Sequence, residues 1–134
     1  TGTLLEGLVQ PYTIAKKAGK KIGIIGLLTD ISSVVDADIA KVLQYQDPVA
    51  VTSKYADYLK NEKGCDMVIC LSHLGYGEDK DLASQVRNVD LIVGGHTHTL
   101  LHKKQLVKNP DGEDVVVVQN WKWGLNMGHL TIDF

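Results

Sequence analysis

Three short, continuous apolar runs constrain the fold of this chain most strongly. They are segments 21–28 (KIGIIGLL), 66–72 (DMVICLS) and 90–95 (DLIVGG). Runs of this length without polar alternation are typical of strands that are buried on both faces, as in parallel sheets. Because helix signals lie between the runs, the pattern predicts an α/β fold with parallel pairing and right-handed crossovers.

The segments between these runs carry the helix signals. Asp47 is predicted to cap a helix that has Pro48 at its first position, and Gly64 is predicted to close it. Residues 78–87 show a second, shorter amphipathic pattern. Residues 29–46 form a polar stretch without clear periodicity.

The pattern changes in the last third of the chain. Residues 101–107 and 114–120 are predicted to form a hairpin around the turn sequence at 109–112, Asn-Pro-Asp-Gly. A last strand is expected at 127–134. The second half therefore predicts antiparallel pairing, and the whole chain predicts a mixed sheet arrangement.

Composition limits the class of protein. The 134 residues suit one domain, and 44% of them are hydrophobic, which is enough for a core. The net charge is −2 with scattered basic residues, so no nucleic-acid polymer is expected as a partner. The apolar runs are too short to span a membrane. Cys65 and Cys70 lie along one extended segment and are expected to be free thiols.

Three histidines are predicted to meet at one edge of the sheet. His73 follows the second apolar run, and His96 and His98 follow the third. Ligands of parallel α/β sheets bind at the carboxyl ends of strands, and extended backbone would place His96 and His98 on one side. A single loop histidine is more often solvated or hydrogen-bonded, so only the three together indicate one metal ion or two. His102 and His129 are expected to pack or face solvent.

The other polar residues are weaker candidates. Glycines 94 and 95 would permit unusual backbone angles or a close approach. The acidic residues at 78, 79 and 81 are expected in a charged first helical turn, and those at 66 and 90 lie at the opposite edge. No acidic residue is well placed to bridge two ions. Trp121 and Trp123 are expected to pack in the hairpin, and Asn120 stays open.

Several motifs resemble one known family when they are taken in order. They are KIGIIGLLT, CDMVICLSHLGYGEDKDLA, VDLIVGGHTHT and VVVVQNWKWG, and with them the chain resembles the calcineurin-like metallophosphoesterases, in particular the 5′-nucleotidase group. The resemblance implies a four-layered α/β/β/α sandwich around mixed sheets. It also implies two divalent ions (Mn, Zn, Fe, Mg or Ca) that activate water to remove phosphate from nucleotides or other phosphate esters.

The resemblance assigns metal ligands residue by residue. It implies that His73 and His96 bind one ion and that His98 binds the other. The family's earlier motifs are an aspartate-x-histidine pair, a bridging aspartate and a glycine-asparagine-histidine segment, and none of them occurs here. Residues 1–134 are therefore expected to be the C-terminal half of a metallophosphoesterase domain, without a complete second domain and inactive alone.

Other functions stay open at this point. The chain could be a non-catalytic metal-binding or interaction module, or part of a cyclic-nucleotide phosphodiesterase of the same superfamily, because fold does not set the substrate. A half domain would expose sheet edges and an apolar face, so a homodimer is expected. The family suggests a periplasmic or cell-surface location, although this sequence shows no export signal.

Overall fold

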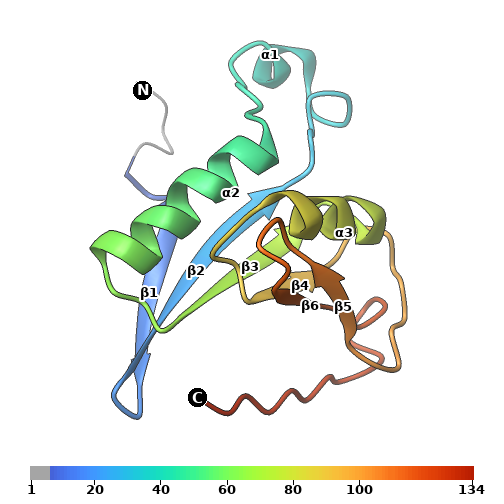
Figure 1. The fold of residues 1–134 in the computed structure, drawn as a ribbon. Coiled ribbons are helices and arrows are strands. Elements are labelled where there is room, and N and C mark those ends of the chain that lie inside the picture. Colours follow the sequence, from blue (N-terminus) through green and yellow to red (C-terminus); the bar gives the residue numbers. More distant parts are fainter. Residues whose placement is uncertain (1–6) are drawn as a thin grey trace.

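One mixed β-sheet organises residues 7–134, the part of the chain that the computed structural model describes (Figure 1). Its strands are β1 (Tyr12–Lys17), β2 (Lys20–Leu28), β3 (Met67–His73), β4 (Leu91–Gly94), β5 (Gln105–Lys108) and β6 (Asp114–Gln119). Their order is β1-β2-β3-β4-β6-β5. The four central strands are parallel, whereas β1 and β5 pair antiparallel at the edges. The predicted α/β class and mixed sheet are confirmed.

Two longer helices and a π-helical turn cover one face of this sheet, and the short helix α1 (Ala37–Ala40) lies beyond the end of β2 (Figure 1). The others are α2 (Pro48–Asp57), the π-helical turn η1 (Tyr58–Glu62) and α3 (Tyr76–Gln85). Figure 1 shows α2 and α3 on the same side of the strands. Their inner faces and the inward strand residues form the core, in which Ile25, Leu59, Leu82, Ile92 and Val117 are almost completely buried. Burial of such side chains from water is the main force that holds the two layers together.

The other face of the sheet is largely open. Leu28, Leu71 and Leu106 point to this face, and they are 51%, 58% and 53% exposed. Residues 7–134 therefore form one helical layer and one sheet layer. These are two of the four layers that the resemblance implies. None of the described helices is long and apolar enough to cross a membrane.

The prediction of a C-terminal strand at 127–134 is wrong. These residues form no ladder and run irregularly beneath the sheet (Figure 1). Leu130 and Ile132 instead line a cavity with Leu91 and Val93, so their alternation reflects contact with the open face and not strand pairing.

Local signals explain most helix boundaries. The Asp47 side chain accepts a hydrogen bond from the Val49 amide at 3.1 Å, as expected of an N-cap. Helix α3 begins at Tyr76, two residues earlier than predicted, and it follows Gly75, whose φ is +122°. The Tyr76 amide donates to Thr97 Oγ1 at 3.0 Å, so a distant residue helps to set this start.

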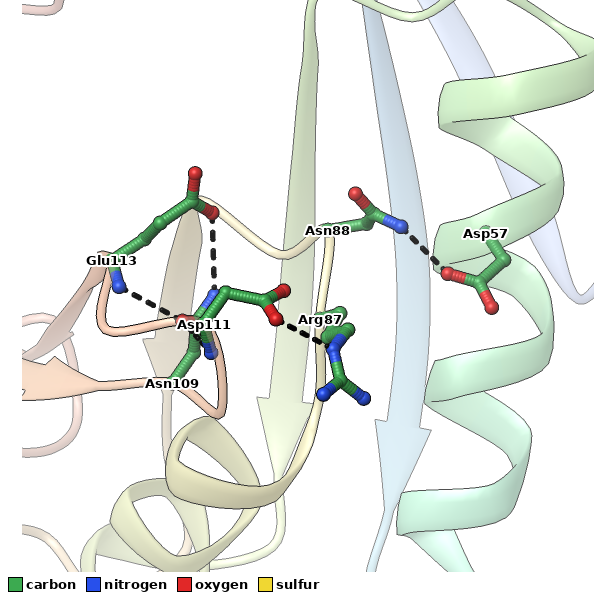
Figure 2. Close-up of polar contacts among 6 residues, drawn as sticks. All are labelled: Asp57, Arg87, Asn88, Asn109, Asp111 and Glu113. Carbon is green, nitrogen blue, oxygen red and sulfur yellow. Dashed lines mark hydrogen bonds and ion pairs between the residues drawn. The ribbon is translucent and has the colours of Figure 1, made fainter.

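Polar contacts join the loops at the amino edge of the central strands (Figure 2). Asn88 donates to Asp57 at the end of α2 at 2.6 Å, and Arg87 donates to Asp111 in the β5–β6 turn at 2.9 Å. Asn109 Oδ1 accepts the amides of Asp111 and Glu113, each at 2.9 Å, which closes the predicted turn. This edge is structural and leaves the carboxyl edge as the place for a site.

The remaining predictions about this edge and the thiols are confirmed. The carboxylates of Asp66 and Asp90 accept the strand amides of Lys21 and Val68, at 2.8 and 2.7 Å, at the edge away from the histidines. Both cysteines are free and buried. Burial raises the pKa of the Cys70 thiol to about 12, so it is a packing group at neutral pH.

Candidate metal centre

Two of the three predicted histidines meet at the carboxyl edge. His73 ends β3, and His96 lies two residues beyond the neighbouring parallel strand β4. Their ring centroids are 5.2 Å apart in an edge-to-face arrangement. Both side chains are exposed, and His73 also lines an open cavity with Leu28, Leu71 and Gly95. Residues far apart in the sequence thus converge where ligands of parallel sheets bind.

His98 lies apart from this pair. Its ring packs edge-on against Trp123, with centroids 6.4 Å apart. Trp123 is 78% exposed, so the expectation that it packs in the hairpin is wrong. Among residues 7–134, no group of three or more His, Cys, Asp or Glu side chains is placed to hold a metal ion.

The backbone explains this separation. The prediction assumed extended backbone, but φ is +71° at His96 and +52° at His98. The Thr97 amide donates to the Gly95 carbonyl at 2.9 Å, which closes a three-residue turn centred on His96. Non-glycine residues at such φ values carry strain, and strain of this kind clusters at functional sites.

The two glycines of this motif provide space. Neither Gly94 nor Gly95 has a positive φ. A Cβ at Gly94 would overlap Asp79 Oδ2, and a Cβ at Gly95 would lie 3.0 Å from His73 Nδ1. The close approach that the sequence suggested is therefore their role, and it lets the histidine segment lie against β3.

Asp79, which the sequence placed only among the acids of a charged helical turn, is a buried carboxyl. It lies in the first turn of α3, as expected, but it is fully buried and not a solvated acid. Its Oδ1 accepts from Ser72 Oγ at 2.5 Å, and its Oδ2 has no hydrogen-bond partner in the described residues. Burial raises the pKa of this carboxyl above its ordinary value, and the Ser72 hydrogen bond acts in the opposite direction. Asp79 lies three and four residues before the buried Leu82 and Ala83, and this spacing places it on the same, inner face of the helix. That spacing was the signal in the sequence that could have predicted its burial.

Ser72 connects Asp79 to the backbone around His73. The Leu74 amide donates to Ser72 Oγ at 3.1 Å, and the same hydroxyl donates to the Asp79 carboxylate. The residues on either side of His73 are therefore joined to each other and to Asp79. The contact fixes the backbone at the end of β3.

Gln119 is a residue that the sequence analysis missed. It ends β6, is 3% exposed, and donates from Nε2 to the Gly95 carbonyl at 2.6 Å. Its Oε1 accepts from the Thr99 amide and from Thr97 Oγ1, the latter at 3.2 Å. The neighbouring Asn120 is exposed and donates to the Asn126 carbonyl at 2.7 Å. Alternate burial of 115, 117 and 119 along β6 was the signal that distinguishes Gln119 from Asn120.

The residues present fit part of a divalent-metal ligand set. Imidazole nitrogens are common ligands of zinc and other transition metals, and the His73–His96 pair offers two of them. A protein site for such an ion usually takes three or four protein ligands. The described residues therefore supply a fraction of the ligands that one ion, or two, would need.

The chain is an α/β domain whose candidate site lies at the carboxyl ends of its parallel strands. No protein-family model matches the chain. A snake venom 5′-nucleotidase of Gloydius brevicauda is 33% identical over 97% of this chain and 24% of its own length. A trifunctional nucleotide phosphoesterase of Bacillus subtilis is 29% identical over 99% of this chain and 9% of its own length.

Solved structures agree with the sequence comparison. A 5′-nucleotidase precursor of Thermus thermophilus matches with a TM-score of 0.76 and 37% identity, over 90% of this chain and 26% of that one. The NAD nucleotidase of Haemophilus influenzae matches with a TM-score of 0.78 and 30% identity, over the same shares. The chain is thus similar to 5′-nucleotidases over nearly all of its own length, and it spans about a quarter or less of the length of these proteins.

Proposed function

We propose that this chain is part of a divalent-metal phosphohydrolase that removes phosphate from nucleotides. In this proposal His73 and His96 bind one ion and His98 binds the other. The observation that carries it is the edge-to-face pair of exposed imidazoles beyond β3 and β4, in a chain similar to 5′-nucleotidases. The ion is one of Mn, Zn, Fe, Mg or Ca.

The chemistry of the donors limits what this chain does alone. Divalent ions lower the pKa of bound water and neutralise phosphate oxygens, which is what hydrolysis of a phosphate ester requires. Neutral imidazoles cancel none of the ions' charge, so carboxylates are also needed. We propose that residues 1–134 are one half of a metallophosphoesterase domain, that the other half supplies these carboxylates, and that the chain alone is inactive.

A chimera tests this proposal directly. In it, this chain replaces the matching quarter of the Thermus 5′-nucleotidase, and phosphate release from AMP is measured with Mn²⁺ or Zn²⁺. We expect an active chimera in which replacing both His96 and His98 by alanine lowers kcat/KM by more than about 100-fold, because even residues that only support ligands contribute 10- to 100-fold. Full activity in the double variant would refute the assignment.

His102→Ala is the matched control for the chimera. His102 is exposed and lies outside the Gly95–Thr99 segment, so its replacement is expected to leave kcat/KM unchanged. A comparable loss in this control would mean that the double variant acts through general damage.

A non-catalytic zinc-binding module is the second candidate function. It is favoured by the separation of His98, which packs against Trp123 and not against the His73–His96 pair. Calorimetric titration of the chain with Zn²⁺ distinguishes the candidates. Two tight sites would contradict the half-site proposal, and zinc binding together with an inactive chimera would favour the module.

The substrate and the location are finer proposals. AMP and a cyclic nucleotide, assayed side by side on the chimera, separate a 5′-nucleotidase from a cyclic-nucleotide phosphodiesterase. We propose a periplasmic or cell-surface location, which is supported by the description of the Thermus relative as a precursor. We also propose that copies of the chain pair through the open face of the sheet.

A further inference from the structure

One side-chain amide reaches both ends of the segment that carries His96 and His98. Gln119 Nε2 donates to the Gly95 carbonyl at 2.6 Å, and Gln119 Oε1 accepts from the Thr99 amide. The amide is therefore paired with backbone on both sides of the two histidines. A buried polar group whose oxygen and nitrogen are both hydrogen-bonded in this way fixes the geometry of the backbone around it.

The same contact lies at the strained turn. The Gly95 carbonyl that accepts from Gln119 also accepts from the Thr97 amide, and this second bond closes the turn centred on His96. With φ at +71°, the backbone of His96 is costly to maintain and persists only if its surroundings hold it. Thr97 Oγ1 adds a link, because it donates to Gln119 Oε1 and accepts from the Tyr76 amide at the start of α3.

Gln119 itself is held by the sheet. It ends β6 opposite Gly94, and its carbonyl accepts from the Leu101 amide at 3.1 Å. The absence of a side chain at Gly94 leaves room for the amide, since a Cβ there would lie 3.3 Å from Gln119 Nε2. A group mounted on a strand is positioned more accurately than one on a loop.

We propose that Gln119 is a positioning residue whose amide holds the Gly95–Thr99 segment so that the His96 ring faces the His73 ring. The functional part of this inference rests on the proposed function, in which these two rings share one ion. The geometric part concerns the metal-free chain and is tested separately.

The first test uses NMR of the metal-free chain. Gln119→Met keeps the length of the side chain and removes both hydrogen-bonding groups, whereas Gln105→Met makes the same change on the neighbouring strand β5. We expect Gln119→Met to abolish the ring-to-ring NOE between His73 and His96 and to speed exchange of the Thr99 amide by about tenfold, the effect of one lost hydrogen bond. Gln105→Met is expected to change neither signal.

The second test uses Co²⁺ alone, followed by its visible absorption on the chain. We expect Gln119→Met to weaken the apparent Co²⁺ affinity by about 10- to 100-fold, as for residues that orient a ligand. A wild-type chain that does not bind Co²⁺ would mean that the His73–His96 pair needs the carboxylates of the other half of the domain. The NMR result would then decide the positioning role, and the chimera would decide the proposed function.

Two outcomes would overturn the inference. One is a Gln119→Met chain that keeps the ring-to-ring NOE and the Thr99 protection, and the other is an unchanged Co²⁺ affinity. If Gln119→Met does not fold, Gln119→Asn replaces it, because it keeps the amide but is one methylene too short to reach both Gly95 and Thr99. The same losses are expected of it, and wild-type signals in that variant would refute the inference.

Discussion

At the scale of single residues, Gly94 is required because its neighbours occupy the volume that a side chain would need. A Cβ there would overlap Asp79 Oδ2 and crowd Gln119 Nε2, and both groups are buried. We expect Gly94→Ala to lower the free energy of unfolding by about 1–3 kcal/mol, the usual cost of overpacking. Urea denaturation followed by circular dichroism measures this change.

Gly26→Ala is the matched control for this prediction. Gly26 lies in the parallel strand β2, and a Cβ there would meet no atom within 4 Å. We expect its effect on the unfolding free energy to stay within about 0.5 kcal/mol, as for most substitutions away from such features. Equal losses in the two variants would show that the overlap at Gly94 is not the cause.

The sequence predicted the meeting of His73 and His96 because strand ends could be located from the apolar runs. The assumption of extended backbone at His96 and His98 was wrong, since nothing local signalled the positive φ of both residues. The sequence analysis also missed the burial of Asp79 and the contacts of Gln119. Asp79 stands among other acids at the start of a helix, and Gln119 stands at the end of a run of valines. Each residue could therefore be explained by its local sequence without a role in the site.

At the scale of elements, Asp66 joins the starts of β2 and β3. Its carboxylate accepts the Lys21 amide at 2.8 Å and faces Lys20 Nζ at 3.3 Å. The hydrogen bond from the Lys21 backbone, and then that from the Lys20 ammonium, lower the pKa of this carboxyl below its ordinary value. A carboxyl whose folded-state pKa is lowered stabilises the fold above its unfolded pKa, about 4.

This contribution is lost as the pH falls through the folded-state pKa of Asp66. We therefore expect Asp66→Asn to have a lower Tm than the wild type at pH 7, and the difference to shrink as the pH falls below about 4. Thermal unfolding at several pH values between about 7 and 3 measures it. A Tm difference that is constant over this range, or that grows in acid, would contradict the assignment.

The bounds of helices and strands were predicted well where local sequence sets them, and poorly where contacts with distant residues set them. The central strands and the Asp47 cap follow from local pattern. The start of α3 depends on the Tyr76–Thr97 contact, and the irregular 127–134 segment depends on the open face that it touches. Neither contact is visible in a local window of sequence.

At the scale of the whole molecule, the open face of the sheet is the dominant surface feature. Three exposed leucines, at positions 28, 71 and 106, lie on three different strands of that face. Exposed apolar side chains gathered on one face are common where a protein contacts another chain. We therefore expect copies of this chain to associate through this face at high micromolar concentration.

A single added charge tests this association. Leu106 lies on the edge strand β5, 53% exposed and opposite Val116 on the open face. We expect Leu106→Lys to shift the sedimentation of the chain toward the monomer, because an interface would bury the new ammonium without a partner. Gln85→Lys adds the same charge on the exposed side of α3 and is expected to leave the distribution unchanged. A wild-type chain that is strictly monomeric at these concentrations, or equal behaviour of the two variants, would show that the open face does not mediate self-association.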